Sequence, residues 1–419
     1  MTKEKDTGRA TTVVAAGTGI NLALGILYSW SVVKAAIPES WGWSNADKAL
    51  PYSIACMVFA LTMIPAGRLQ DRYGPRLIAS MGGLLTGAGF IVASVVGNSL
   101  AGFVAGFGVL AGMGIGCGYA AATPPAVKWY PPQKTGLVAG VVVAGFGLAS
   151  IYIAPLATKL LKAFSTTTPT GTVEQGVSST MLVFGIAFVV VVTALAQLLV
   201  NPPAGHQPGG TAAKTQAKTL PRVELDWRAM LAHPQFYVLW FMYFAGAAAG
   251  LTFISVAQGL GKRSLGELAF LTVVVLAIGN AGGRILAGVV SDRIGRQSTL
   301  LGAFLLQAAT VTVLYLVKGG ASWPIIMLIV LAIGMSYGSN LSLFPSACKD
   351  YFGLASFGLN YGVLFSAWGA AGLAMPWING VVIDRTGSDS VAYFVIIGLL
   401  LVGAGLTFAS RRIAAGVPS

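Results

Sequence analysis

The sequence predicts an all-α membrane protein with twelve transmembrane helices in two six-helix halves. Three observations lead to this prediction: the composition, the number and length of the apolar stretches, and an internal repeat. Of the 419 residues, 55% are hydrophobic and only 9% are charged, and the mean hydropathy is +0.77. Such values are typical of polytopic membrane proteins and exclude the soluble classes.

Twelve apolar stretches of about 20 residues follow one another, and each is long enough to cross a bilayer as a helix. The predicted spans are 12–35, 48–66, 77–97, 100–123, 136–160, 179–200, 235–257, 266–290, 298–317, 323–345, 357–382 and 390–410. Residues 1–11 are polar, and no small-residue cleavage site follows the first stretch, so we expect an uncleaved first span. The even number of spans puts both termini on one side.

The distribution of basic residues predicts which side that is. Of the 26 Lys and Arg residues, 17 fall at the termini or in the loops on their side, and 8 fall in the loops on the other side. This asymmetry predicts cytoplasmic termini, in a bacterial inner membrane. The net charge of +13 then reflects topology and lipid contact, so we expect no nucleic-acid partner.

An internal repeat divides the chain. Residues 66–74 and 287–295 share the pattern A-G-x-x-x-D-R-x-G at an offset of 221 residues, and the same offset relates Pro124 to Pro345. Two matches in one register predict two parallel halves, with the substrate between them near the midplane of the bilayer. We expect an N-terminal bundle at 1–200, a cytoplasmic linker with a short surface helix at 201–234, and a C-terminal bundle at 235–419.

The repeated motif resembles the signature of the major facilitator superfamily. Three further stretches resemble its branch of bacterial oxalate:formate antiporters and monocarboxylate transporters: Tyr28-Ser-Trp30, residues 231–240, and Trp129-Tyr130 followed by residues 136–145. The resemblance covers essentially the whole chain. It implies the major facilitator fold, with transport by alternating access between the two halves.

Arg284 is the one charged residue that hydropathy places deep inside a span. A guanidinium there costs roughly 2.5–3.5 kcal/mol on insertion scales and stays protonated, so it needs a partner. All thirteen Asp and Glu residues lie in loops or at span ends, which favours a mobile anion as that partner. The alternative is a structural arginine that donates to backbone carbonyls. We also expect Gly279, Gly282 and Gly283 to leave room for a ligand beside it.

Polar and aromatic residues at similar depth complete the candidate substrate site. Tyr119 is expected to face Arg284 and to donate to a substrate oxygen, unless it is an ordinary buried tyrosine. Asn280 lies one turn before Arg284 on the same helix face, where it can bind a substrate hydroxyl, orient the guanidinium or simply pack. Tyr337 and Trp368 form an aromatic wall or merely pack, and we add Tyr28 from the first span.

The resemblance also bears on the cargo and on the loops. Oxalate-exchanging relatives carry a lysine where Trp368 stands, so a single fixed charge here implies a monoanion such as lactate or pyruvate. Eukaryotic monocarboxylate transporters place an aspartate at the position of Asn280, which leaves the proton-binding group open. On charge alone, the charged residues of the repeated motif fit a gating latch or simple positive-inside anchors, and the resemblance implies the latch on the cytoplasmic side; they are Asp71, Arg72, Asp292 and Arg293.

Three functions follow in order of preference. The first is proton-coupled symport of a small monocarboxylate, the second is anion exchange or uniport, and the third is a carboxylate sensor without transport. The chain has no paired midplane acids, no nucleophile beside a base and no phosphate-binding loop, so we expect no enzyme activity and no cofactor or metal. The expected partners are the substrate, a proton and the lipid bilayer, and we expect a monomer.

Overall fold

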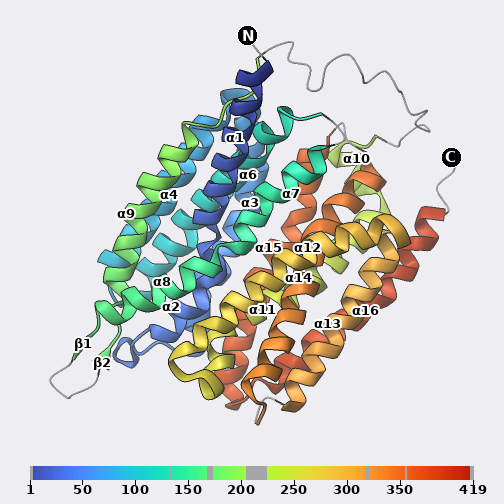
Figure 1. Cartoon of the computed structure of the whole chain (residues 1–419). Helices are drawn as coiled ribbons and strands as arrows, with labels where there is room; N and C mark the ends of the chain where they lie inside the picture. The colour runs from blue at the N-terminus through green and yellow to red at the C-terminus, as the bar shows by residue number, and fades with distance from the viewer. Residues whose placement is uncertain are drawn as a thin grey trace.

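The computed structural model describes residues 3–131, 134–167, 173–203, 224–317, 320–353 and 356–415. Long helices run roughly parallel through the molecule (Figure 1). Both termini lie at one end of this bundle, here called the termini end, and the short hairpin of β1 (Thr166–Thr167) with β2 (Val173–Glu174) marks the opposite, hairpin end. The predicted all-α fold is confirmed, with this hairpin as a small addition.

The first half is made of short and long helical segments. They are α1 (Lys3–Leu24), η1 (Gly25–Ser29), α2 (Trp30–Ala36), η2 (Glu39–Trp41), α3 (Asn45–Tyr73), α4 (Pro75–Val95), α5 (Leu100–Phe103), η3 (Val104–Ala111), α6 (Gly112–Lys128), α7 (Thr135–Leu148), α8 (Ser150–Ala163) and α9 (Val177–Ala196).

The second half has fewer interruptions. It consists of α10 (Trp227–Ala232), α11 (Pro234–Leu265), η6 (Gly266–Ala269), α12 (Phe270–Ile294), α13 (Arg296–Val317), α14 (Trp323–Phe352), α15 (Phe357–Thr386) and α16 (Ser390–Ala415).

Eleven helical stretches in the described residues are long and apolar enough to cross a membrane, and all of them overlap predicted spans. The remaining predicted span, 357–382, is the 30-residue helix α15, whose polar residues include Asn360 and Asn379. Both asparagines are buried, so their amides do not face lipid. Large apolar side chains such as Leu84 and Leu328 are more than half exposed on the outside of the bundle, where lipid covers them.

Two of the predicted spans are broken near their middle. The first changes from α1 to α2 through the 3-10 turn η1, and the fifth breaks between α7 and α8. A Cβ on Gly25 would lie 2.4 Å from the carbonyl oxygen of Phe146, so only glycine permits this approach. The Ser29 hydroxyl donates to the Ser150 hydroxyl at 3.0 Å, which joins the two breaks and holds Tyr28 at the interface between the halves.

The last glycine of each repeated motif ends a helix. Gly74 follows α3 with φ 88° and ψ 160°, and Gly295 follows α12 with φ 87° and ψ 158°. Residues with a side chain rarely adopt this conformation, which explains why the motif ends in glycine in both halves. The matching geometry confirms that the sequence repeat is a structural one.

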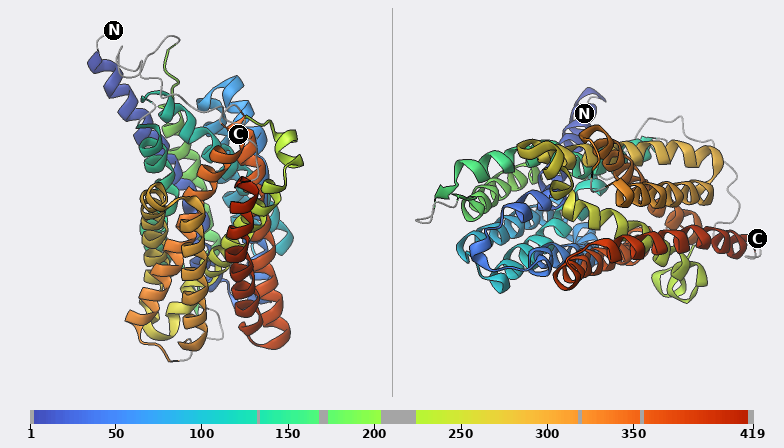
Figure 2. Two further views of the ribbon diagram at one scale, coloured as in Figure 1. Left: turned by 90° about the vertical axis from the view of Figure 1, so that its right-hand side faces the viewer. Right: turned by 90° about the horizontal axis from the view of Figure 1, so that it is seen from below.

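The two halves lie side by side, with the blue-to-green helices next to the yellow-to-red ones in Figures 1 and 2. Helices α3 and α15 form the most extensive contact between them. Of the predicted linker, residues 204–223 lie outside the described residues, whereas the expected surface helix is α10. The N–H of Leu225 donates to the Phe352 carbonyl, and Asn360 Nδ2 donates to the Leu225 carbonyl, so this segment is tied to α14 and α15. The domain boundaries themselves stay a prediction.

Candidate functional site

Arg284 lies near the middle of α12, where its side chain is 9% exposed. Its Nε donates to Asn280 Oδ1 at 3.1 Å, and its Nη1 donates to the carbonyl oxygen of Val143 at 3.0 Å. Val143 belongs to α7 of the first half, so the guanidinium bridges the two halves. Among the described residues, no carboxylate lies within ion-pair distance of it. A neutral carbonyl therefore occupies the position that the sequence assigned to an anion.

Gly279 and Gly283 do not leave room for a ligand beside Arg284, which corrects the expectation for these two glycines. A Cβ on Gly279 would lie 2.3 Å from the Leu331 carbonyl oxygen, and one on Gly283 would lie 2.0 Å from that of Met335. Both glycines allow α12 to pack closely against α14. Gly282 has nothing within 4 Å of its Cβ position and is the only one of the three with open space beside it.

Asn280 is fully buried next to the guanidinium. Because its Oδ1 accepts from Arg284, its Nδ2 must point elsewhere, and this nitrogen has no hydrogen-bond partner in the described residues. A buried donor without an acceptor is uncommon and calls for an explanation. It would be satisfied by an oxygen atom of a ligand bound to Arg284.

Tyr119 on α6 is the third donor of this group. Its hydroxyl is close enough to Arg284 to interact with the guanidinium charge, as the sequence suggested. Its ring packs edge-to-face against Phe59 at 5.4 Å and Phe146 at 5.3 Å between centroids. Arg284, Asn280 and Tyr119 thus bring N–H and O–H donors from both halves together, which suits an anion.

Sequence reasoning missed Gly147 as part of this group. A Cβ on Gly147 would lie 3.6 Å from both Cζ and Nη2 of Arg284, so the bare backbone of α7 lies against the guanidinium. The internal repeat could have indicated it. At the repeat offset of 221 residues, Gly147 is the position in the first half that corresponds to Trp368, a candidate site residue, in the second half. The Val143 carbonyl had no such signal, since every residue has a backbone carbonyl.

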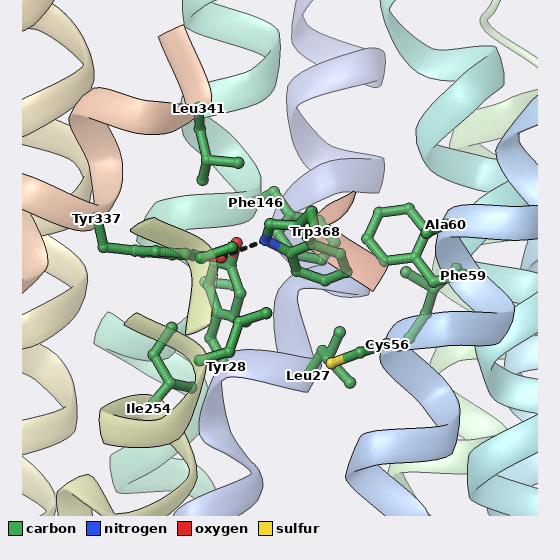
Figure 3. Packing of buried hydrophobic residues seen from close by; sticks show 14 of the residues in the cluster. Leu27, Tyr28, Cys56, Phe59, Ala60, Phe146, Ile254, Tyr337, Leu341 and Trp368 are labelled. Atoms are coloured by element: carbon green, nitrogen blue, oxygen red, sulfur yellow. Dashed lines mark hydrogen bonds between the residues drawn. The ribbon is translucent and has the colours of Figure 1, made fainter. Parts of the chain in front are cut away.

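Tyr28, Tyr337 and Trp368 form a second group, shown in Figure 3. The Tyr337 hydroxyl lies 2.8 Å from the Tyr28 hydroxyl and accepts a hydrogen bond from Trp368 Nε1 at 2.8 Å. Tyr28 comes from η1 in the first half, while Tyr337 and Trp368 come from α14 and α15. All three are at most 3% exposed, so they join the halves inside the bundle.

Aromatic rings extend this group into a layer that includes Phe59 and Phe146 beside Trp368 (Figure 3). The Phe59 ring lies 5.3 Å from Trp368, 5.7 Å from Phe365 and 5.8 Å from Phe146, measured between centroids. Tyr28 in turn meets Phe146 edge-to-face at 5.1 Å. Tyr337 and Trp368 therefore lie in a packed aromatic layer between the halves, and this layer has a hydrogen-bonded core.

The charged residues of the repeated motif make contacts within their own halves. Asp71 pairs with Lys128 at 3.7 Å, and the Arg72 guanidinium lies 5.2 Å from the centre of the Tyr73 ring. Asp292 pairs with Arg296 at 2.9 Å, and Arg296 also pairs with Asp350 at 3.2 Å. Arg293 is exposed. These residues lie at the termini end, and their pairs tie neighbouring helices together within each half.

A second set of polar contacts between the halves lies at the hairpin end. Asp384 accepts hydrogen bonds of 2.9 Å from the N–H of Asn45, from Asn45 Nδ2 and from the N–H of Ala46. The carboxylate thereby caps the N-terminus of α3 from the opposite half. Lys162 and Glu267 add an exposed ion pair at 3.7 Å. The hydrogen bonds and the ion pair that we find between the halves, among the described residues, lie at this end or at mid-depth.

Close helix packing accompanies this cap. Cβ atoms on Gly380, Gly372 and Gly369 of α15 would lie 2.4–2.6 Å from atoms of α3, whereas one on Gly362, nearer the termini end, would lie 3.2 Å from a flexible isoleucine side chain. The two helices therefore approach most closely from mid-depth to the hairpin end. The interface between the halves is therefore closed at the hairpin end.

We expect the Asp384 cap to depend on pH. Burial raises the pKa of Asp384, but hydrogen bonds from Ala46 and Asn45 outweigh it and hold the pKa below its usual value of about 3.9. A lowered pKa stabilises the folded state at neutral pH, and this contribution is lost as the pH falls through the lowered value. Wild type should therefore unfold at a higher temperature than Asp384→Asn at pH 7, and the difference should shrink as the pH falls below the usual carboxyl pKa of about 3.9.

Thermal unfolding of the two purified proteins between pH 3 and pH 7 measures this effect. Glu39→Gln removes an exposed carboxylate from the same end and serves as the control. A difference that stays constant over the whole pH range would contradict the cap.

Comparison with known proteins agrees with this architecture. A family model described as Major Facilitator Superfamily matches residues 16–376. The oxalate:formate antiporter of Oxalobacter formigenes is 27% identical over 391 residues, which cover 93% of this chain and 88% of the antiporter. Monocarboxylate transporter 11 of Homo sapiens is 27% identical over 418 residues, which cover 96% and 83% of the two chains.

A solved structure supports the fold independently. The structure of a bacterial homologue of the human lysosomal transporter Spinster, in an inward-facing and occupied conformation, matches with a TM-score of 0.69. The match covers 96% of this chain and 97% of the other at 17% sequence identity, so it concerns the fold alone.

Proposed function

The chain belongs to the major facilitator superfamily of transporters, and from this premise we propose that it carries small monocarboxylates such as lactate and pyruvate across the bacterial inner membrane. Membership in a family of transporters argues against an enzyme and against a sensor that moves nothing. The observation that carries the proposal is the buried Arg284, which has a carbonyl and an amide as partners but no carboxylate among the described residues.

A substrate carboxylate would replace the Val143 carbonyl on Arg284. The planar guanidinium donates to both oxygens of a carboxylate at once, and such charge-assisted hydrogen bonds are roughly twice as strong as neutral ones. Asn280 Nδ2 and the Tyr119 hydroxyl would supply further donors to the same ligand. This exchange frees α7 from α12, so binding would be coupled to a change in how the halves meet.

A monoanion fits this site better than a dianion. Arg284 is the single formal charge in the interior of the described bundle, and the neighbouring layer of Phe59, Phe146 and Trp368 is apolar. A second carboxylate of oxalate would face these rings without a cationic partner, and its desolvation would be costly. The apolar body of lactate or pyruvate would pack against them.

Transport would proceed by alternating access. The halves would rock about the layer of Tyr28, Tyr337 and Trp368, with the α3–α15 contact opening when the termini end closes. The basic residues at the termini end support a cytoplasmic location for both termini. The charge pairs of Asp71 and Asp292 would stiffen each half so that it moves as a unit.

Coupling to a proton removes the electrical cost of uptake. Moving a monoanion into a cell against an inside-negative potential costs roughly 2.3 kcal/mol per 100 mV, and a co-transported proton cancels that charge. Arg284 cannot release a proton at physiological pH, so the proton would travel with the substrate or on an acid at the rim, such as Asp384, Asp47 or Glu267.

Anion exchange is the second candidate, favoured by the similarity to an oxalate:formate antiporter. An exchanger also avoids net charge movement, because one anion leaves as another enters. It differs from a symporter in needing an anion on the far side.

Uptake into proteoliposomes tests the proposal. Radiolabelled lactate, pyruvate and oxalate are offered to the reconstituted protein with and without an inward proton gradient, and with and without unlabelled lactate inside. We expect lactate and pyruvate, but not oxalate, to accumulate with the proton gradient alone. Uptake that requires internal anion and ignores the gradient would indicate exchange, and uptake of none of the three acids would refute the proposed substrate class.

A further inference from the structure

A cavity at the termini end of the first half lies apart from the Arg284 site. Its volume is about 510 Å³, and it opens where α1, α4, α6 and the chain after α9 converge. Its wall combines two guanidinium groups, Arg9 and Arg76, with Trp129, Leu198 and Pro203. Among the residues that the structure describes, no acidic residue lines it. The cavity is therefore cationic on one side and apolar on the other.

Two hydrogen bonds build the wall of this cavity. Arg76 Nε donates to the Leu199 carbonyl at 3.2 Å, and Trp129 Nε1 donates to the Val200 carbonyl at 2.8 Å. They fix the chain that leaves α9 against the start of α4 and the end of α6. The left-handed turn at Gly74 places Arg76 in the first turn of α4. The arginine is thus positioned by the fold rather than free on the surface.

The guanidinium groups of Arg9 and Arg76 have N–H donors that can bind a ligand. Within the described residues, the Nη groups of Arg76 have no hydrogen-bond acceptor, and only its Nε is bonded, to Leu199. Neither Arg9 nor Arg76 forms an ion pair in the part of the chain whose side chains the structure describes. Two such groups facing one cavity attract an anion with several oxygen atoms, and arginine matches the geometry of phosphate especially well.

The depth of the cavity favours a lipid as the source of that phosphate. It lies at the ends of the apolar spans of α4 and α9, the level at which headgroups sit. Leu198 at the cavity is 45% exposed, and Leu77 and Leu84 along α4 are each 51% exposed. These side chains offer an apolar surface for acyl chains next to the guanidinium groups. A free phosphate would use the arginines but not that surface.

We propose that this cavity binds the phosphate headgroup of an anionic glycerophospholipid, with Arg9 and Arg76 on the phosphate and the acyl chains along α4. Basic pockets between transmembrane helices on the cytoplasmic side suit such headgroups. The lipid site lies apart from the carboxylate site, so a test of lipid binding does not depend on the proposed transport function. The bound lipid would hold the ends of α1, α4 and α9 together.

Native mass spectrometry of the full-length protein in detergent tests the proposal. The protein is mixed with dioleoylphosphatidylglycerol, with dioleoylphosphatidylcholine or with inorganic phosphate, and the bound fraction is compared. We expect phosphatidylglycerol to be retained at least about fivefold better than phosphatidylcholine, because only the former has a net negative charge. The preference should disappear in Arg9→Gln/Arg76→Gln.

A matched double variant controls for net charge. Arg68→Gln/Lys134→Gln removes two positive charges from the same end, outside the cavity, and should retain the preference. If the double variant at Arg9 and Arg76 does not fold, Arg9→Gln alone is used, because the exposed Arg9 side chain does not hold the wall. Unchanged lipid binding in these variants would overturn the proposal. Retention of inorganic phosphate that competes with the lipid would overturn the lipid as the source and leave an anion site.

Discussion

Replacing Arg284 by Gln is expected to reduce the initial rate of lactate and pyruvate uptake at least about 30-fold. Removing one partner of a buried charge pair costs roughly 2–5 kcal/mol, and every 1.4 kcal/mol is tenfold in affinity. Glutamine keeps a polar side chain beside Val143 but loses the charge and the planar fork. The uptake rate in proteoliposomes, normalised to the amount of reconstituted folded protein, measures the effect.

Two further variants separate a substrate-binding arginine from a structural one. Arg284→Lys keeps the charge but not the bidentate geometry, so it should fold normally and transport at an intermediate rate. Arg68→Gln makes the same chemical change at an exposed position and should transport like wild type. If Arg284→Gln lowers the unfolding temperature but leaves the rate per folded molecule unchanged, the residue only ties α12 to α7.

The fold was predictable from the sequence because each membrane-spanning helix is determined by its own stretch of residues. An apolar stretch of sufficient length becomes a helix in lipid whatever its neighbours are, since its backbone must bond internally. The offset of 221 residues then supplied the two-half arrangement, and Gly74 and Gly295 show that the repeated motif has one local geometry in both places. The breaks at η1 and between α7 and α8 were not predictable, because they depend on contacts between distant helices.

The candidate site was predictable only in part. Arg284 could be identified because it is a charged residue within an apolar stretch. Tyr119 and Asn280 could be assigned to the same site because they lie at a similar depth along their predicted spans. The Val143 carbonyl could not be predicted, because every residue has a backbone carbonyl and the sequence does not show which one accepts the hydrogen bond. The prediction that Gly279 and Gly283 leave room for a ligand was wrong, because both glycines allow close packing of α12 against α14. The Asp384 cap required knowing which helices of the two halves meet at the hairpin end.

A single methyl group at Gly380 is expected to prevent the hairpin end from closing. A Cβ there would lie 2.6 Å from the Cα of Ala46 and 2.7 Å from the Asn45 carbonyl oxygen. These are backbone atoms that cannot rotate away, so Gly380→Ala forces α3 and α15 apart. Overpacking of this kind costs about 1–3 kcal/mol, which would shift the equilibrium between open and closed states by roughly 5- to 150-fold.

The separation would also withdraw Asp384 from the N–H groups of Asn45 and Ala46. The α3–α15 packing and the Asp384 cap should therefore be lost together. Spin labels on cysteines introduced at the exposed Glu39 and Thr386 report the distance across the hairpin end, because all three native cysteines are buried. We expect a longer distance in Gly380→Ala and uptake slowed at least about tenfold, since a carrier that cannot close one end cannot complete its cycle.

Gly358→Ala is the matched control for this prediction, because it adds the same methyl group to the same helix where nothing lies within 4 Å. It should leave both the distance and the uptake rate unchanged. Asp384→Asn, which keeps the helix contact but removes the carboxylate, should lengthen the distance less than Gly380→Ala does. If Gly380→Ala left the label distance and the uptake rate at wild-type values, the α3–α15 contact would be ordinary packing and not a gate, and closure would have to depend on the aromatic layer at mid-depth instead.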